Sequence, residues 1–144
     1  MKKNIAIILV LIIVAIAAFS TWCIQVSNIQ KEVADYNSEY EKIYQNGQIN
    51  GVDLTTIINK AIDNNEKNSI GKDENNTYID DGVYYTEIYV KVTDDERAAY
   101  PMEAIQEVGL SEFTRLYGSL NFECTKTEYH ENGRISKLTF EIIN

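Results

Sequence analysis

The hydrophobic positions of the chain form one continuous apolar run at the N-terminus and shorter periodic segments after it. From Ile5 to Trp22 there are eighteen residues without a charge, and the apolar character continues to Ile24. As a helix with a rise of 1.5 Å per residue, this run is about 27 Å long, close to the roughly 30 Å hydrocarbon core of a membrane. The pattern predicts a transmembrane helix over residues 5–24, in contact with the lipid bilayer.

The charges that flank this run predict its orientation. Lys2 and Lys3 precede it, whereas the first charge after it is Lys31. Positive charges favour the cytoplasmic side, so residues 1–4 are expected in the cytoplasm of a cell-membrane protein and residues 25–144 outside it. A signal peptide is the alternative, because Ala15-Ile16-Ala17 has the small residues of a cleavage site. Cleavage near Ala17/Ala18 would release a secreted binding domain, but the apolar run continues beyond this point and favours an anchor.

A stripe of apolar and aromatic residues continues the helical pattern beyond the membrane. These candidate seam residues alternate at intervals of three and four, and are Val26, Ile29, Val33, Tyr36, Tyr40 and Ile43. They predict a helical stem over residues 25–46, which Gly47 would end in a left-handed conformation. About two and a half heptads are too few for a self-sufficient coiled coil, so we expect the seam to pack on the chain's own domain rather than to mediate self-association.

Residues 47–144 are expected to form the extracytoplasmic α+β domain. Asn46–Gly51 reads as a loop, and Asp53 is placed to cap a helix with five apolar positions at helical spacing, Leu54, Ile57, Ile58, Ala61 and Ile62. Asp63–Asn76 is almost entirely polar and predicts a solvated loop. Its oxygen-bearing residues do not keep the spacing of a calcium loop, because Lys67 interrupts it.

The segment from Val83 to Val92 alternates as a strand does. One side carries Tyr84, Ile88, Val90 and Val92 and is the expected core face. The other side carries the candidate interaction surface, which consists of Tyr85, Glu87, Tyr89 and Lys91. Tyrosines among charges suit contact with a protein, a peptide or a glycan.

Two short helices are expected between this strand and the C-terminal hairpin. Thr93 and Glu96 have the spacing of a capping box, and Pro101 can open a helix in its first turn. Gly109 and Gly118 are placed to end the two helices. The second is expected to bury Phe113, Leu116 and Tyr117.

The C-terminal hairpin has a preferred register. A two-residue Asn132-Gly133 turn would divide its large apolar residues between the two faces. A three-residue loop, Glu131-Asn132-Gly133, instead pairs Cys124 with Phe140 and Phe122 with Ile142 on one face. The predicted fold class is therefore α+β, with a long N-terminal helix followed by a small antiparallel sheet that has helices on one face.

The composition limits the function classes. The chain has 13 basic and 22 acidic side chains, a net charge of -9, and residues 25–144 alone carry a net charge of -11. A domain this acidic repels phosphate backbones, so nucleic acid is not an expected partner.

The sequence lacks a motif for catalysis or for cofactor binding. The cysteines, Cys23 and Cys124, are expected in different environments and not in a disulfide, and His130 is the single histidine, with no second ligand at zinc spacing. The Asp80-Asp81 and Asp94-Asp95-Glu96 runs adjoin turns or helix starts, where acids are common. We therefore expect no enzyme activity, no cofactor and no metal.

Three stretches carry a resemblance to a known group of proteins: YNSEYEKIYQNGQINGVDLTTIINKAIDNN, EVGLSEFTRLYGSLNFEC and YHENGRISKLTF. With the N-terminal anchor, they resemble small single-pass membrane proteins of unknown function from clostridia and related low-GC Gram-positive bacteria. The resemblance implies location and architecture only. The expected function is a non-catalytic interaction or assembly role at the outer side of the membrane, with an unknown protein partner and with the long helix of a pilin-like subunit.

Overall fold

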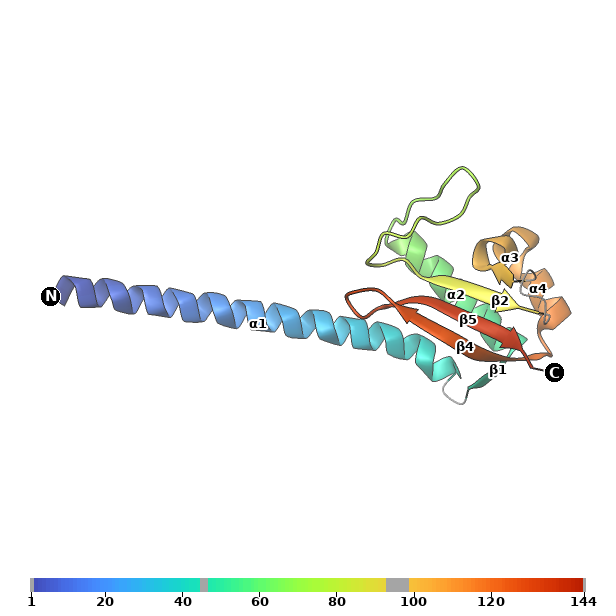
Figure 1. The fold of residues 1–144 in the computed structure, drawn as a ribbon, viewed down its shortest axis with the longest axis horizontal. Helices are drawn as coiled ribbons and strands as arrows, with labels where there is room; N and C mark the ends of the chain where they lie inside the picture. The colour runs from blue at the N-terminus through green and yellow to red at the C-terminus, as the bar shows by residue number, and fades with distance from the viewer. Residues whose placement is uncertain (1, 45–46, 93–98, 144) are drawn as a thin grey trace. The chain divides into compact units, whose positions relative to one another are not determined.

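The computed structural model describes residues 2–44, 47–92 and 99–143. The chain divides into two compact units, Met1–Asp35 and Tyr36–Asn144. The first unit is part of a single helix, α1 (Lys2–Tyr44), and the second contains the end of α1 and all the other elements (Figure 1).

The first unit exposes the apolar side chains of α1. Leu11 is 62% exposed and Phe19 is 64% exposed. Among the described residues, one helix is long and apolar enough to cross a membrane, and this helix covers Ile7–Tyr44 near the N-terminus. The N-terminal helix is thus consistent with a membrane anchor or a signal sequence, because both have this composition.

The second unit is built on a five-stranded sheet. Its strands are β1 (Gln48–Asn50), β2 (Glu87–Lys91), β3 (Ala99–Pro101), β4 (Asn121–Tyr129) and β5 (Ile135–Ile142), in the spatial order β1-β4-β5-β2-β3. The predicted α+β class is confirmed. The sheet is mixed rather than wholly antiparallel, since β2 pairs with β5 in parallel and the other neighbours are antiparallel. A parallel pair needs a long crossover, and the chain between β2 and β5 provides it.

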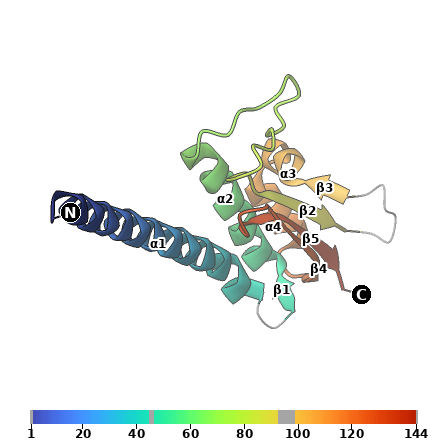
Figure 2. The same ribbon diagram turned by 60° about the vertical axis from the view of Figure 1, so that its left-hand side comes forward.

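The helices of this unit pack on one face of the sheet. They are the last turns of α1, α2 (Gly51–Lys67), α3 (Met102–Val108) and α4 (Leu110–Tyr117), and Figure 2 shows α2 against the sheet. The five predicted apolar residues of α2 are all buried in a core that includes Ile88, Val90, Phe122, Leu138 and Phe140 from the strands. The predicted arrangement of helices on one face is confirmed.

The bounds of α2 differ from the predicted ones. Residues 48–50 form β1 rather than a loop, and Asn50, not Asp53, caps the helix. The Asn50 side chain accepts a hydrogen bond from the Asp53 N–H at 2.9 Å and donates one to its carboxylate at 3.0 Å. At the other end, the helix continues to Lys67 into the predicted loop. The buried side-chain amide of Asn65 explains this extension. It accepts a hydrogen bond from the Thr86 N–H and donates one to the Thr86 C=O, both at 2.9 Å.

The hairpin between β4 and β5 has the predicted loop. The His130 N–H bonds the Arg134 C=O at 2.9 Å, and Gly133 takes a left-handed φ of 86°. Cys124 pairs with Phe140, and Phe122 with Ile142, as predicted. Two irregularities in β4, between Cys124 and Lys126 and between Glu128 and Tyr129, shift the pairing by one residue in the middle of the strand. Lys126, and not Thr125, therefore lies opposite Thr139.

The two short helices end at Gly109 and Gly118, as predicted. Pro101 is the residue before α3 rather than its first residue. Phe113 is buried, but Leu116 is exposed, because α4 has only eight residues and turns one narrow side to the core. The predicted capping box, Thr93 with Glu96, lies outside the described residues.

The predicted stem is divided between the two units. Tyr40 is 1% exposed, and Tyr36 and Ile43 pack against the same core, so this half of the seam packs on its own domain as expected. Ile29 is 56% exposed in the first unit. The described helix ends at Tyr44, and Gly47 has the predicted left-handed conformation with a φ of 78°.

Candidate interaction surface

One face of the sheet lacks a helical cover among the described residues. On β2 this face carries Glu87, Tyr89 and Lys91, whose partners on β5 are Lys137, Thr139 and Glu141 in parallel register. With β4, these strands form a shallow hollow. We call this surface the open face, and its residues are Glu87, Tyr89, Lys91, Thr125, Lys126, Glu128, Lys137, Thr139 and Glu141.

Ion pairs cross the open face between neighbouring strands. Lys91 Nζ lies 2.9 Å from Glu141 Oε1, and Lys137 Nζ lies 3.2 Å from Glu87 Oε2. The Lys91 hydrogen bond holds the pKa of Glu141 below its ordinary value. Each pair is partly exposed, so each contributes at most about 1 kcal/mol to the stability of the fold. They fix the charged groups in place more than they stabilise the domain.

Tyr89 occupies the centre of the β2 row. The Lys137 ammonium lies 3.8 Å from the centroid of its ring, a cation–π contact. Burial and the neighbouring Glu87 carboxylate raise the pKa of Tyr89, so its hydroxyl is neutral near pH 7. The ring therefore offers an apolar surface with a hydrogen-bonding tip, held between charges of both signs.

Three of the four predicted surface residues lie together, and the fourth does not. Glu87, Tyr89 and Lys91 are on the open face, whereas Tyr85 is 6% exposed and belongs to the core. The strand begins at Glu87, not at Val83, so the alternation cannot be extended back to Tyr85.

The loop before β2 gives the physical reason. The Asp81 carboxylate accepts hydrogen bonds from the backbone N–H groups of residues 83, 84 and 85 at 2.7–2.9 Å, which curls this segment instead of extending it. Tyr84, predicted for the core, is consequently exposed.

Sequence reasoning did not predict that β5 lies beside β2. The sequence contains a charge pattern that indicates this pairing. Along β2 the acidic Glu87 comes first and the basic Lys91 last, whereas along β5 the basic Lys137 comes first and the acidic Glu141 last. Only a parallel register places each acid of one strand next to the base of the other. This charge pattern predicts the pairing that the structure has.

The two cysteines are free thiols, as expected. Burial raises the pKa of Cys124, which keeps this thiol protonated and unreactive near neutral pH.

No family model, no curated protein and no solved structure matches this chain.

Proposed function

We propose that the protein is a single-pass membrane protein whose outer domain binds a protein partner without catalysing a reaction. The observation that carries the anchor is the exposed apolar surface of α1 between Ile5 and Ile24. The charge-free part of this helix is long enough to cross the hydrocarbon core of a membrane. The two lysines before it favour a cytoplasmic N-terminus. Residues 25–144 would then lie on the extracytoplasmic side.

The open face is the proposed binding surface. Three lysines and three glutamates balance on it, although the domain as a whole is strongly acidic. A surface with equal numbers of positive and negative groups does not favour a polymer whose charges all have one sign. With a central tyrosine, it suits a protein surface that carries both positive and negative charges. The carboxylates of Glu87 and Glu141 are engaged by lysines, which fits binding better than acid–base catalysis.

Fractionation of the full chain tests the anchor. We expect the protein to remain in the membrane pellet after carbonate extraction, with an intact mass that includes residues 5–24, and protease added to spheroplasts should digest the outer domain. A soluble mature chain that begins near Ala18 would instead establish the secreted alternative.

Site-specific photo-crosslinking tests the binding surface. A photoreactive phenylalanine replaces Tyr89 in the full chain, and the matched control carries it at Tyr129, an exposed tyrosine outside the open face. We expect a discrete crosslinked protein from position 89 only, with a several-fold lower yield when Lys91→Glu and Lys137→Glu reverse the neighbouring charges. Equal yields from positions 89 and 129, or a yield that the reversal does not change, would contradict the role of the open face.

A further inference from the structure

His130 lies at the start of the β4–β5 loop, and its side chain is only 4% exposed. Its Nε2 atom is 2.7 Å from the Tyr85 carbonyl oxygen. A carbonyl oxygen can only accept, so Nε2 carries the proton and donates this hydrogen bond. In the neutral imidazole, Nδ1 therefore has a free lone pair, which is how a backbone carbonyl orients a metal-binding histidine.

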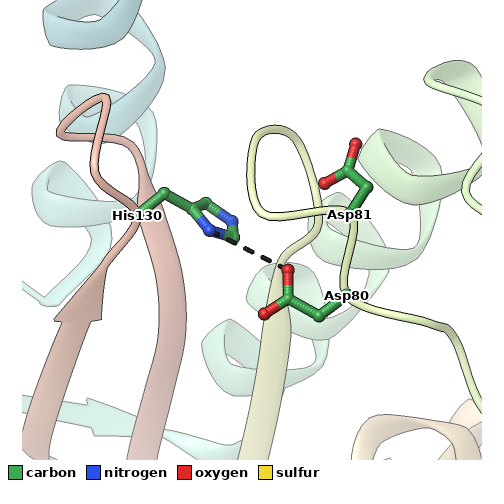
Figure 3. A group of neighbouring side chains, drawn as sticks. All are labelled: Asp80, Asp81 and His130. Atoms are coloured by element: carbon green, nitrogen blue, oxygen red, sulfur yellow. Dashed lines mark ion pairs between the residues drawn. The ribbon is translucent and has the colours of Figure 1, made fainter.

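The Nδ1 atom faces the Asp80 carboxylate in the loop before β2, and Asp81 is the next residue of that loop (Figure 3). It lies 3.9 Å from Asp80 Oδ1, which is too far for a hydrogen bond. One ligand atom from each of Asp80, Asp81 and His130 lies within 4.8 Å of the others. Two metal–ligand bonds of about 2.0–2.2 Å span up to about 4 Å, so Nδ1 and Asp80 Oδ1 already have the separation of two ligands of one ion, and a shift of about 1 Å or less brings the third ligand atom within reach.

Backbone hydrogen bonds hold both aspartates before any ion arrives. Asp80 Oδ1 accepts the N–H of Gly82 at 2.7 Å, and Asp81 Oδ1 accepts three N–H groups. The second oxygen of each carboxylate accepts no hydrogen bond from the described residues.

We propose that Asp80, Asp81 and His130 form a binding site for a divalent transition-metal ion. One imidazole nitrogen and two carboxylate oxygens suit ions such as Zn²⁺ or Mn²⁺, with water in the remaining positions. The ion would join the loop before β2 to the hairpin between β4 and β5, two segments that are about fifty residues apart in the sequence. This proposal concerns a site separate from the open face and does not depend on binding there.

The single histidine of the chain makes the test direct. The full chain in detergent micelles is labelled with ¹⁵N-histidine, and its imidazole nitrogens are observed by NMR at pH 8, where an unperturbed histidine is neutral. The metal-free protein should show the Nε2–H form. Adding Zn²⁺ alone should shift the Nδ1 resonance in a saturable 1:1 titration, and Mn²⁺ should broaden the same signals.

Matched substitutions assign the aspartates. Asp80→Asn should weaken Zn²⁺ binding at least about tenfold, whereas Asp63→Asn, an exposed carboxylate on α2, should leave it unchanged. Asp80→Asn keeps the three amide bonds of Asp81, and an unchanged amide NMR spectrum would show that it folds. An Nδ1 resonance that does not respond to Zn²⁺, or equal affinities for the two variants, would overturn the proposal and leave Asp80 and His130 as an ion pair that forms only when His130 is protonated.

Discussion

The two lengths of α1 have the same backbone conformation but opposite environments. The large apolar side chains from Ile5 to Ile24 are exposed and Val26 and Val33 are half-buried, whereas residues 36–44 pack their aromatic side chains in the domain core. The sequence pattern changes along the helix, from an uninterrupted apolar run that ends at Ile24, through a mixed segment over residues 25–35, to tyrosines at intervals of four. Helix continuity therefore does not define the unit of folding, because the first length leaves its apolar run exposed and the second packs into the core of the domain.

The contacts of the second length show what that partner supplies. The rings of Tyr36 and Tyr40 are 5.1 Å apart, and Tyr44 meets Phe140 edge to face at 5.9 Å. The Arg134 guanidinium lies 3.7 Å from the centroid of the Tyr36 ring. The Tyr36–Tyr40 contact lies within α1, whereas Phe140 belongs to β5 and Arg134 to the loop before it, so the end of α1 is an integral part of the domain.

Removing a buried ring should give the largest contrast between the two lengths. Tyr40→Ala should lower the free energy of unfolding of the domain by about 3–5 kcal/mol, because it opens a cavity in the core. Ile29→Ala, on the exposed length, should change it by less than about 0.5 kcal/mol. Urea denaturation of the full chain in micelles, followed by near-UV circular dichroism of the tyrosines, measures both. Equal losses would show that both lengths belong to one folding unit.

Local signals in the sequence were sufficient for several elements. The apolar spacing of α2 predicted its buried face, and the apolar residues around Gly133 predicted the three-residue loop and the pairing of Cys124 with Phe140. The stripe of tyrosines predicted that the end of α1 packs on its own domain. In each case the pattern that gives the prediction lies within a few turns of helix or one hairpin.

Contacts between distant segments were not predictable in the same way. The helical state of Asp63–Lys67 depends on Asn65, whose side chain forms the two hydrogen bonds to the Thr86 backbone that a neighbouring strand would otherwise form. The burial of Tyr85 depends on the Asp81 carboxylate, which curls the chain before β2. The approach of His130 to Asp80 depends on the parallel pairing of β2 with β5. Polar side chains that bond a remote backbone leave no periodic trace in the sequence.

A polar contact at the boundary of the two lengths should give an intermediate effect. The Asn37 side chain accepts a hydrogen bond from the Ile135 N–H and donates one to the Gly133 C=O, both at 2.9 Å. Asn37→Ala leaves both backbone groups without this partner, so we expect a loss of about 1–3 kcal/mol. Asn28→Ala, on the exposed length, is the matched control and should be near neutral in the same urea experiment. If Asn37→Ala is as mild as its control, the hairpin does not depend on α1.

The smallest expected effect comes from an ion pair on the buried length. Glu39 Oε2 lies 2.9 Å from Lys60 Nζ on α2, and this hydrogen bond, opposed by burial, lowers the pKa of Glu39. Because the Glu39 side chain is largely exposed and the Lys60 side chain is partly exposed, Glu39→Gln should cost only a few tenths of a kcal/mol at pH 7, and less in high salt. A lowered pKa in the folded state means that the stabilisation is present above the ordinary carboxyl pKa of 4.5 and is lost as the pH falls below it. The difference in the free energy of unfolding between wild type and Glu39→Gln should therefore disappear in acid. Glu41→Gln is the control, because it removes a charge that has no ion pair in the described structure, and it should show no such pH dependence.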